Sequence, residues 1–137
     1  MSELATVEDA IAVAEFRAAL RQFLRRSERI ARQSGLTPQR YLLLLMIKGA
    51  PSGDAQSTVT ELAERLQLAQ STVTELVRRA EEAGLIAREQ SQRDARVAHL
   101  RLTDEGERRL QRSFTMLETE RRQLREAFAH FEEVASV

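Results

Sequence analysis

The sequence predicts a single, mainly α-helical domain that carries one small β-hairpin. Its 137 residues suit one hydrophobic core. Apolar residues recur at spacings of three and four over most of the chain, as on amphipathic helices, and two strand-like stretches with alternating or β-branched character lie within residues 85–102. The hexapeptide Ser-Thr-Val-Thr-Glu-Leu occurs at residues 57–62 and again at 71–76, and it bears on how the central helices are divided.

Composition excludes several classes of protein. The chain has no cysteine, which rules out disulfides, thiolate metal sites and thiol-based redox sensing. Its 21 basic and 21 acidic residues give a net charge of zero, which argues against a nonspecific polyanion binder. The longest apolar run, 41–47, is far shorter than the roughly 20 residues that span a bilayer. We therefore expect a cytoplasmic protein without a membrane segment.

A long amphipathic helix is predicted over residues 8–33. Gly35 closes it, and its stripe consists of Val13, Phe16, Leu20, Phe23 and Ile30. Residues 16–40 also contain seven arginines against one acid, Glu28. Such a basic run is either a solvated helix face or a surface that meets phosphate.

A second helix follows at once. Thr37 is its N-cap, and Pro38 occupies the first helical position, where the missing N–H costs nothing. Residues 42–47 are apolar all round, so this helix is predicted to be buried. Glycine, proline and serine at 49–53 end it in a loop that reaches about Ser57.

The repeated hexapeptide has two competing interpretations. From Val59 to Ala80 the apolar residues follow a heptad spacing, as in one long coiled-coil helix. Each copy also contains a capping box, Thr58 with Glu61 and Thr72 with Glu75, which is typical of a helix start. The second copy would moreover place three β-branched residues inside a long helix. Two separate helices are therefore predicted.

Two short helices joined by a tight turn form a helix-turn-helix, here at residues 58–84. Ala63 in the first helix and Val73 ten residues later allow the close approach that this packing needs. The turn carries Gln67 where glycine is usual, so the sequence does not ensure a left-handed residue there. A plain three-helix core is the alternative to a DNA-binding unit.

A hairpin at residues 85–102 follows the second helix, which Gly84 ends. Two strand-like stretches, 85–89 and 97–102, flank the polar segment 91–96, and a hairpin in this place is a wing. At its tip Arg96 can enter a narrow minor groove while Asp94 fixes its guanidinium. The alternative is a solvated tip with a local ion pair.

After the wing, Thr103 is predicted to cap a final long helical region. Its apolar stripe is broken once, at Arg121, and consists of Leu110, Phe114, Leu117, Leu124, Phe128 and Phe131. Together with the first helix it offers more apolar surface than a small domain needs, so we expect a partner chain to cover it. Alternatively, both helices fold onto the core of their own domain.

Catalytic signals are missing from the sequence. His99 and His130 are far apart, and no cluster of histidines and carboxylates has metal-ligand spacing. There is no glycine-rich phosphate loop and no Ser/His/Asp signature. We expect no enzyme activity, no metal and no cofactor.

With these features, the chain resembles the MarR (multiple antibiotic resistance regulator) family of bacterial winged-helix transcription factors. The most specific residues are Asp94-x-Arg96 and Leu102-Thr103-x-x-Gly106; Leu36-Thr37-Pro38, Glu61-Leu62-Ala63 and Gly84-Leu85-Ile86 also match. The resemblance implies an N-terminal dimerisation helix at 1–36, a winged helix-turn-helix domain at 37–102 with its wing at 85–102, and C-terminal dimerisation helices at 103–137.

The resemblance also implies residue roles. A homodimer would bind a pseudo-palindromic operator in double-stranded DNA, with its two recognition helices roughly 34 Å apart. The recognition helix would meet DNA through Gln70, Ser71, Thr72, Thr74, Glu75 and Arg78, and the wing through Arg93, Asp94 and Arg96. The dimer would form through Val13, Phe16, Leu20, Phe23, Leu117, Leu124, Phe128 and Phe131.

The chain departs from the family at Glu75, where many relatives carry arginine. Glu75 can accept a hydrogen bond from cytosine N4, or it can pair with Arg78 or Arg79 one turn further on. Pairing within the helix is the simpler interpretation.

Many relatives bind small aromatic or acidic ligands between the dimer helices and the winged-helix lobe. Residues that suit such a crevice are Arg17, Tyr41 and Leu45, with Phe16, Leu20 and Phe23 beside them. The resemblance thus implies a repressor in the bacterial cytoplasm, associated with the nucleoid when bound to DNA and released by a ligand. The alternative is a winged-helix module that contacts proteins and does not bind DNA specifically.

Overall fold

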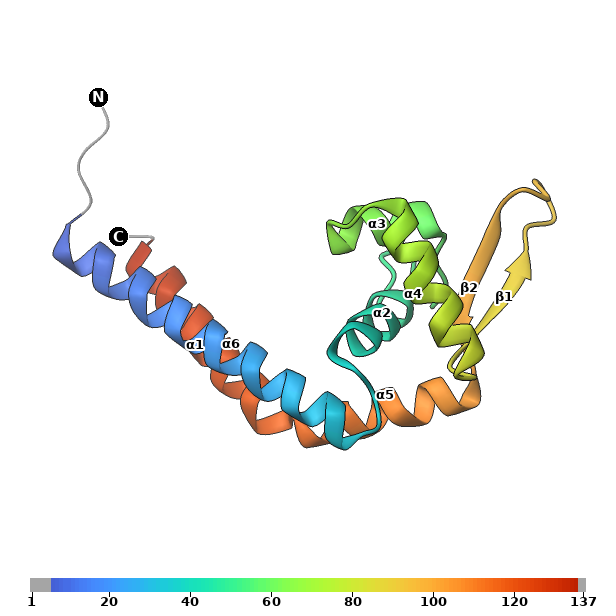
Figure 1. The fold of residues 1–137 in the computed structure, drawn as a ribbon. Helices are drawn as coiled ribbons and strands as arrows, with labels where there is room; N and C mark the ends of the chain where they lie inside the picture. The colour runs from blue at the N-terminus through green and yellow to red at the C-terminus, as the bar shows by residue number, and fades with distance from the viewer. Residues whose placement is uncertain (1–5, 136–137) are drawn as a thin grey trace, which may run out of the picture.

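The computed structural model describes residues 6–135; residues 1–5 and 136–137, the outer ends of the two predicted dimerisation segments, lie outside this range. The described chain forms a helical lobe with a two-stranded wing, and a two-helix arm that leaves the lobe (Figure 1). The elements in order are α1 (Val7–Gln33), α2 (Pro38–Lys48), α3 (Val59–Leu66), α4 (Gln70–Glu82), β1 (Ile86–Gln90), β2 (Ala98–Leu102), α5 (Asp104–Met116) and α6 (Glu118–Ala135).

The first helix spans almost the predicted residues and ends where the sequence indicated. A capping box starts α1, in which the Asp9 amide donates to Thr6 Oγ1 at 3.1 Å and the Thr6 amide to Asp9 Oδ2 at 3.1 Å. After the last turn Gly35 takes a φ of +81°, and the Leu36 amide closes the helix on the Ala31 carbonyl at 2.9 Å.

Helix α2 starts as predicted but is not buried on every side. The hydroxyl of Thr37 accepts from the Arg40 amide at 3.1 Å, with Pro38 in the first turn. Leu43, Leu44 and Ile47 are fully buried, whereas Leu42 remains 41% exposed. The prediction of burial all round is therefore wrong, because the face with Leu42 borders an open cavity beneath α1.

The two copies of the hexapeptide lie in separate helices, which confirms the helix-turn-helix over the coiled coil. Helix α3 has the predicted capping box, with Thr58 Oγ1 accepting from the Glu61 amide at 3.2 Å. It ends at Gln67, which adopts the left-handed conformation (φ 57°, ψ 46°) without being glycine. Its side-chain amide donates to the Glu64 carbonyl at 2.6 Å and holds this turn.

The second predicted capping box does not form. Helix α4 begins at Gln70 with Ala69 as its N-cap, so Thr72 lies inside the first turn, and no side chain caps the helix. Three β-branched residues, 72–74, therefore do stand in a helix. The reason is the preceding turn: once Gln67 has ended α3, the extended Ala69 already directs the chain into α4 two residues before the hexapeptide's threonine.

The wing is the predicted antiparallel hairpin. Register runs from Ile86 opposite Leu102 to Gln90 opposite Ala98. The sequence did not indicate a further bridge, in which Ser57 exchanges two backbone hydrogen bonds with Leu100, at 3.1 and 2.8 Å. This bridge ties the loop before α3 to the wing.

Helix α5 begins at its predicted cap and packs closely on the base of the wing. Thr103 Oγ1 accepts from the Gly106 amide at 3.1 Å and donates to the Gly84 carbonyl at 2.6 Å. A Cβ at Gly106 would lie 2.2 Å from the Leu85 carbonyl oxygen. The spacing Thr103-x-x-Gly106 therefore combines a cap with a close approach between α5 and Leu85, the residue directly before β1.

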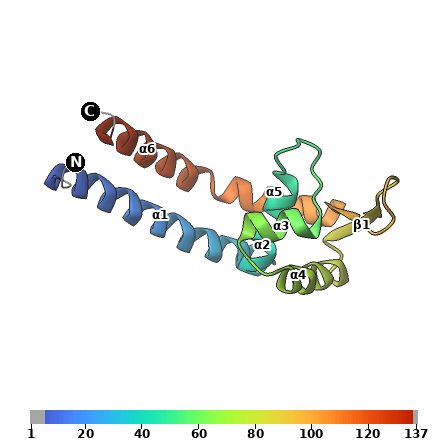
Figure 2. The same ribbon diagram turned by 90° about the horizontal axis from the view of Figure 1, so that it is seen from above.

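The predicted final helical region is two helices, interrupted at Leu117. Helices α1 and α6 lie side by side in opposite directions and form the arm, as both views show (Figures 1 and 2). The ring of Phe16 lies 5.8 Å from that of Phe128 and 5.2 Å from that of Phe131, measured between centroids. The lobe's core contains side chains from α2, α3, α4, the wing and α5.

Candidate nucleic-acid interface

The exposed start of α4 carries the polar residues predicted for the recognition helix. Helical phase turns Val73, Val77 and Ala80 into the core, where none of them is exposed. The same phase leaves outward the side chains of Gln70, Ser71, Thr72 and Thr74. This face therefore offers amide and hydroxyl groups, which can donate to and accept from base edges or phosphate oxygens.

Glu75 is held by arginines of its own helix. The guanidinium of Arg78 donates to both carboxylate oxygens, from Nε at 3.0 Å, and Arg79 Nε donates at 3.1 Å. The hydrogen bonds from Arg78 are the main reason that the pKa of Glu75 falls to about 2. Arg78 also pairs with Glu82. The pairing within the helix that the sequence suggested is thus present, and Arg78 and Arg79 have carboxylate partners already.

At the wing tip, Asp94 and Arg96 are joined. Asp94 Oδ1 accepts from the Arg96 amide at 3.0 Å and from its Nε at 3.2 Å. The Ser91 amide donates a hydrogen bond to the Val97 carbonyl at 2.9 Å and closes the tip. Ser91 Oγ accepts from the Arg93 amide at 3.2 Å. The Arg96 side chain nevertheless remains 92% exposed. The arrangement presents a partly oriented guanidinium to the solvent.

Two contacts that the sequence did not reveal fix the wing to the lobe. Arg88 Nη2 donates to Glu81 on α4 at 2.7 Å. This hydrogen bond raises the pKa of Arg88, although partial burial acts in the opposite direction. Arg101 Nη2 donates to Gln56 at 3.1 Å and lies 3.4 Å from Glu89. The partners lie up to 45 residues apart, so no local pattern could have indicated them.

The predicted dimerisation residues lie mostly on the arm, with one exception. Val13 and Phe128 are 43% and 47% exposed, and Phe16, Leu20, Phe23, Leu124 and Phe131 are half-buried between α1 and α6. Leu117 is fully buried in the core of its own chain. The role assigned to Leu117 needs correction: the interruption between α5 and α6 turns this side chain inward, and no surface of it is left for a partner.

A largely apolar cavity of about 390 Å³ lies between α1, α2, α5 and the start of α6. Tyr41 and Leu45 line it, as does Phe23, whereas Arg17 lies further along α1 and does not. Burial raises the pKa of Tyr41, against the opposing effects of nearby Ser27 and the charge of Arg121. The cavity thus combines aromatic and aliphatic walls with the hydroxyls of Ser27 and Tyr41, and it contains one carboxylate, Glu28, and one guanidinium, Arg121.

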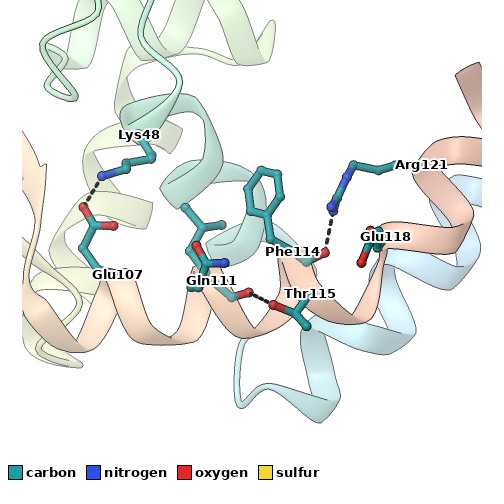
Figure 3. Close-up of a pocket in the computed structure, with 8 residues that line it drawn as sticks. Lys48, Glu107, Gln111, Phe114, Thr115, Glu118 and Arg121 are labelled. Carbon is teal, nitrogen blue, oxygen red and sulfur yellow. Dashed lines mark hydrogen bonds and ion pairs between the residues drawn. The ribbon is translucent and has the colours of Figure 1, made fainter.

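A second, more polar cavity of about 410 Å³ opens beside α5 (Figure 3). Lys48 pairs with Glu107 at 2.7 Å across one end of it. At the other, Arg121 donates to the Phe114 carbonyl at 2.7 Å and lies over the Phe114 ring, 4.6 Å from its centroid. These contacts explain the break in the apolar stripe, because Arg121 satisfies a carbonyl where α5 ends.

Comparison with protein families and solved structures confirms the resemblance stated above. Residues 34–97, which include α4 and the wing tip, match the sequence model of the MarR family. The members of this family are transcription regulators and not enzymes, which supports the prediction that the chain is not an enzyme. No curated protein matches the chain.

The winged-helix fold class is confirmed by solved structures. The MarR family transcription regulator SP03579 has a TM-score of 0.71 and 24% identity, over 93% of this chain and 82% of that one. The transcriptional regulator Tm0710 from Thermotoga maritima has a TM-score of 0.64 and 27% identity, over 75% and 70%. Sco3205 from Streptomyces coelicolor, a MarR family transcriptional regulator solved in complex with DNA, has a TM-score of 0.69 and 21% identity, over 99% and 90%. Among residues 6–135, no helix is long and apolar enough to cross a membrane.

Proposed function

We propose that this chain, whose residues 34–97 match the MarR family, is a dimeric, sequence-specific DNA-binding transcription regulator that acts as a repressor. The observation that carries the proposal is the pairing of two exposed elements on one lobe. Polar side chains cover the start of α4, and Arg96 lies exposed in the turn of the wing. The wing extends from the same lobe as α4 (Figure 1). A helix for the major groove and a cation for the minor groove are the two parts that a winged reading head needs.

The uncapped start of α4 supports the same function. Because no side chain caps this helix, its first backbone N–H groups remain available to phosphate oxygens. Gln70 Nε2 lies 3.4 Å from Thr60 Oγ1 of α3, so the two helices of the motif are linked at the surface that would meet DNA. In this proposal Gln70, Ser71, Thr72 and Thr74 contact bases or backbone, whereas Arg78 enters only if Glu75 releases it.

Two copies are needed for a pseudo-palindromic site, and the arm is the surface that we assign to the dimer. Its exposed apolar side chains are Val7, Ile11, Val13, Leu24 and Phe128, at 72%, 51%, 43%, 49% and 47% exposure. Apolar side chains at this exposure are stabilised when a partner covers them. A regulator of this kind acts at the chromosome, so we place it in the cytoplasm.

Fluorescence anisotropy against the DNA flanking the chain's own gene tests the proposal. We expect nanomolar affinity that weakens steeply as salt rises. Arg96→Ala should weaken binding by about 1–3 kcal/mol, with the melting temperature unchanged. Arg112→Ala on α5, also an exposed arginine and outside the arm, serves as the matched control and should bind like the parent.

The contrary outcome also has a meaning. Micromolar affinity that is the same for every sequence would refute the regulator and favour the protein-interaction module. The contacts of Glu75 are the feature that favours this alternative, since they neutralise two arginines on the recognition helix.

The cavity beneath α1 is our candidate effector site, for a small aromatic acid. A volume of about 390 Å³ accommodates such a ligand, apolar walls suit its ring, and Arg121 supplies the cation for its carboxylate. Isothermal titration with benzoate tests this. Leu42→Trp should fill the cavity and weaken binding at least tenfold, whereas Leu68→Trp, at a residue with almost the same exposure (42% against 41%), should not. Equal affinities would remove the cavity from the proposal.

A further inference from the structure

The arm is divided lengthwise into halves of opposite charge. We call residues 7–16 and 126–135 the tip, and residues 17–33 and 118–125 the base. The tip contains no arginine or lysine, and its six acids are Glu8, Asp9, Glu15, Glu126, Glu132 and Glu133. The base contains three acids against nine arginines, namely Arg17, Arg21, Arg25, Arg26, Arg29, Arg32, Arg121, Arg122 and Arg125. The tip therefore has a net charge of −6 and the base of +6.

The fold of one chain brings like charge to like charge. Because α1 and α6 run in opposite directions, the acidic start of α1 lies beside the acidic end of α6 (Figure 2). In the base, an ion pair between Arg26 and Glu120 at 3.7 Å joins the two helices. In the tip, Glu15 lies 3.9 Å from His130, which is charged only when protonated. The intramolecular packing thus concentrates each charge.

The two halves are far enough apart to act separately. Helix α1 has 27 residues and is therefore about 40 Å long, so the centres of tip and base lie roughly 20 Å apart. The Debye length at physiological salt is about 8 Å. Each half therefore interacts mainly with whatever faces it directly.

The uncovered apolar surface runs through both halves. Val7, Ile11, Val13 and Phe128 belong to the tip and Leu24 to the base, and each is at least 43% exposed. An occupant of this face has to cover apolar side chains while bringing cations to the tip and anions to the base. A uniformly charged partner satisfies one half and is repelled by the other.

We propose that a second copy of this chain fits this face, with its arm antiparallel, so that the acidic tip of each arm lies against the arginine-rich base of the other. The charge pattern then selects both the partner and the register of pairing, since a parallel register would oppose tip to tip. The inference rests on the dimer proposed above and adds the rule by which arms recognise each other.

Charge-altering variants of the full chain test this register. A tip variant carries Glu15→Lys, Glu126→Lys and Glu132→Lys, which makes the tip neutral. A base variant carries Arg17→Glu, Arg21→Glu and Arg25→Glu, which makes the base neutral. A control variant carries Asp54→Lys, Glu64→Lys and Glu89→Lys on the lobe, with the same change in net charge as the tip variant.

Sedimentation equilibrium at low salt should show the dimer dissociation constant of each arm variant raised at least about tenfold, and that of the control unchanged. Native mass spectrometry of the two arm variants mixed should show the mixed dimer in excess over both homodimers. In that dimer one tip and one base are unaltered, and the introduced lysines face the introduced glutamates. At about 1 M salt, where the Debye length is only about 3 Å, the differences should disappear.

The outcomes separate this inference from the proposed function. If the parent chain stays monomeric at all concentrations, the proposed dimer itself fails. If the parent dimerises and the arm variants dimerise equally well, with a statistical mixture of species, the dimer stands and the charge register is wrong. Loss of dimer in the base variant alone would also overturn the register, because the tip would then have no part in it. Circular dichroism checks that each variant retains its helices.

Discussion

The same hexapeptide occupies two helices of this lobe and buries a different side chain in each. At residues 57–62 the leucine, Leu62, is fully buried and Val59 only partly; at 71–76 the valine, Val73, is fully buried and Leu76 only partly. The threonine and glutamate differ too, since Thr58 caps α3 whereas Thr72 lies exposed within α4. Identical local chemistry therefore does not decide which face of a helix enters the core.

The difference follows from where each helix starts. Helix α3 begins at the valine of its copy, whereas α4 begins three residues before the valine of its own. An offset of three residues rotates the hexapeptide by about 300° relative to the helix start. Docking against α2 and the wing then selects Leu62 in one helix and Val73 in the other. Because Glu75 takes part in no capping box, its carboxylate pairs with Arg78 and Arg79 instead.

The largest effect is expected from the two leucines. Leu62→Ala removes a fully buried side chain and should lower the free energy of unfolding by about 2–5 kcal/mol. Leu76→Ala should cost about 1 kcal/mol, because this side chain is partly exposed already. Urea denaturation at one fixed protein concentration measures both. Equal losses would show that the two copies are packed alike.

Alanine substitutions of the two threonines should lower the free energy of unfolding by different, smaller amounts. Thr58→Ala removes the cap of α3 and should cost about 1 kcal/mol. Thr72→Ala removes no capping hydrogen bond and should change the stability by less than about 0.5 kcal/mol. Thermal melts followed by circular dichroism give the comparison. A comparable loss in Thr72→Ala would indicate that the second capping box does form in solution.

The smallest effect concerns the pH dependence of stability. The folded pKa of Glu75 is about 2, mainly because Arg78 donates to its carboxylate, against an ordinary value of about 4.3 in the unfolded chain. Its contribution is thus present above the unfolded pKa and is lost as pH falls toward 2. Glu75→Gln should flatten the decline of stability between about pH 5 and 2.

The control for this prediction lies on the same helix. Thr72→Ala has no titrating group and should keep the parent's slope in urea titrations over the same pH range. A Glu75→Gln profile parallel to that of the parent would mean that the arginine contacts of Glu75 do not persist in solution.

Helix starts with short-range chemistry could be read from the sequence. Thr37 with Pro38, Thr58 with Glu61, and Thr103 with Gly106 place all their partners within three residues, so the pattern and the structure agree. For the same reason the Asp94 and Arg96 pair at the candidate site could be anticipated from two positions in a turn. The division of the chain into arm helices, helix-turn-helix and wing follows from these signals and from apolar spacing.

The features that the sequence did not determine depend on contacts between residues that are distant along the chain. Thr72 and Glu75 repeat the letters of a capping box, yet the left-handed Gln67 and the docking of Val73 start α4 earlier. Leu117 shares its stripe with residues predicted for the dimer interface but is turned into the core by the interruption before α6. Likewise the Ser57 bridge to Leu100 has no local signature. Capping acts over three or four residues and can therefore be recognised in a sequence. Burial depends on surfaces that only the folded chain brings together.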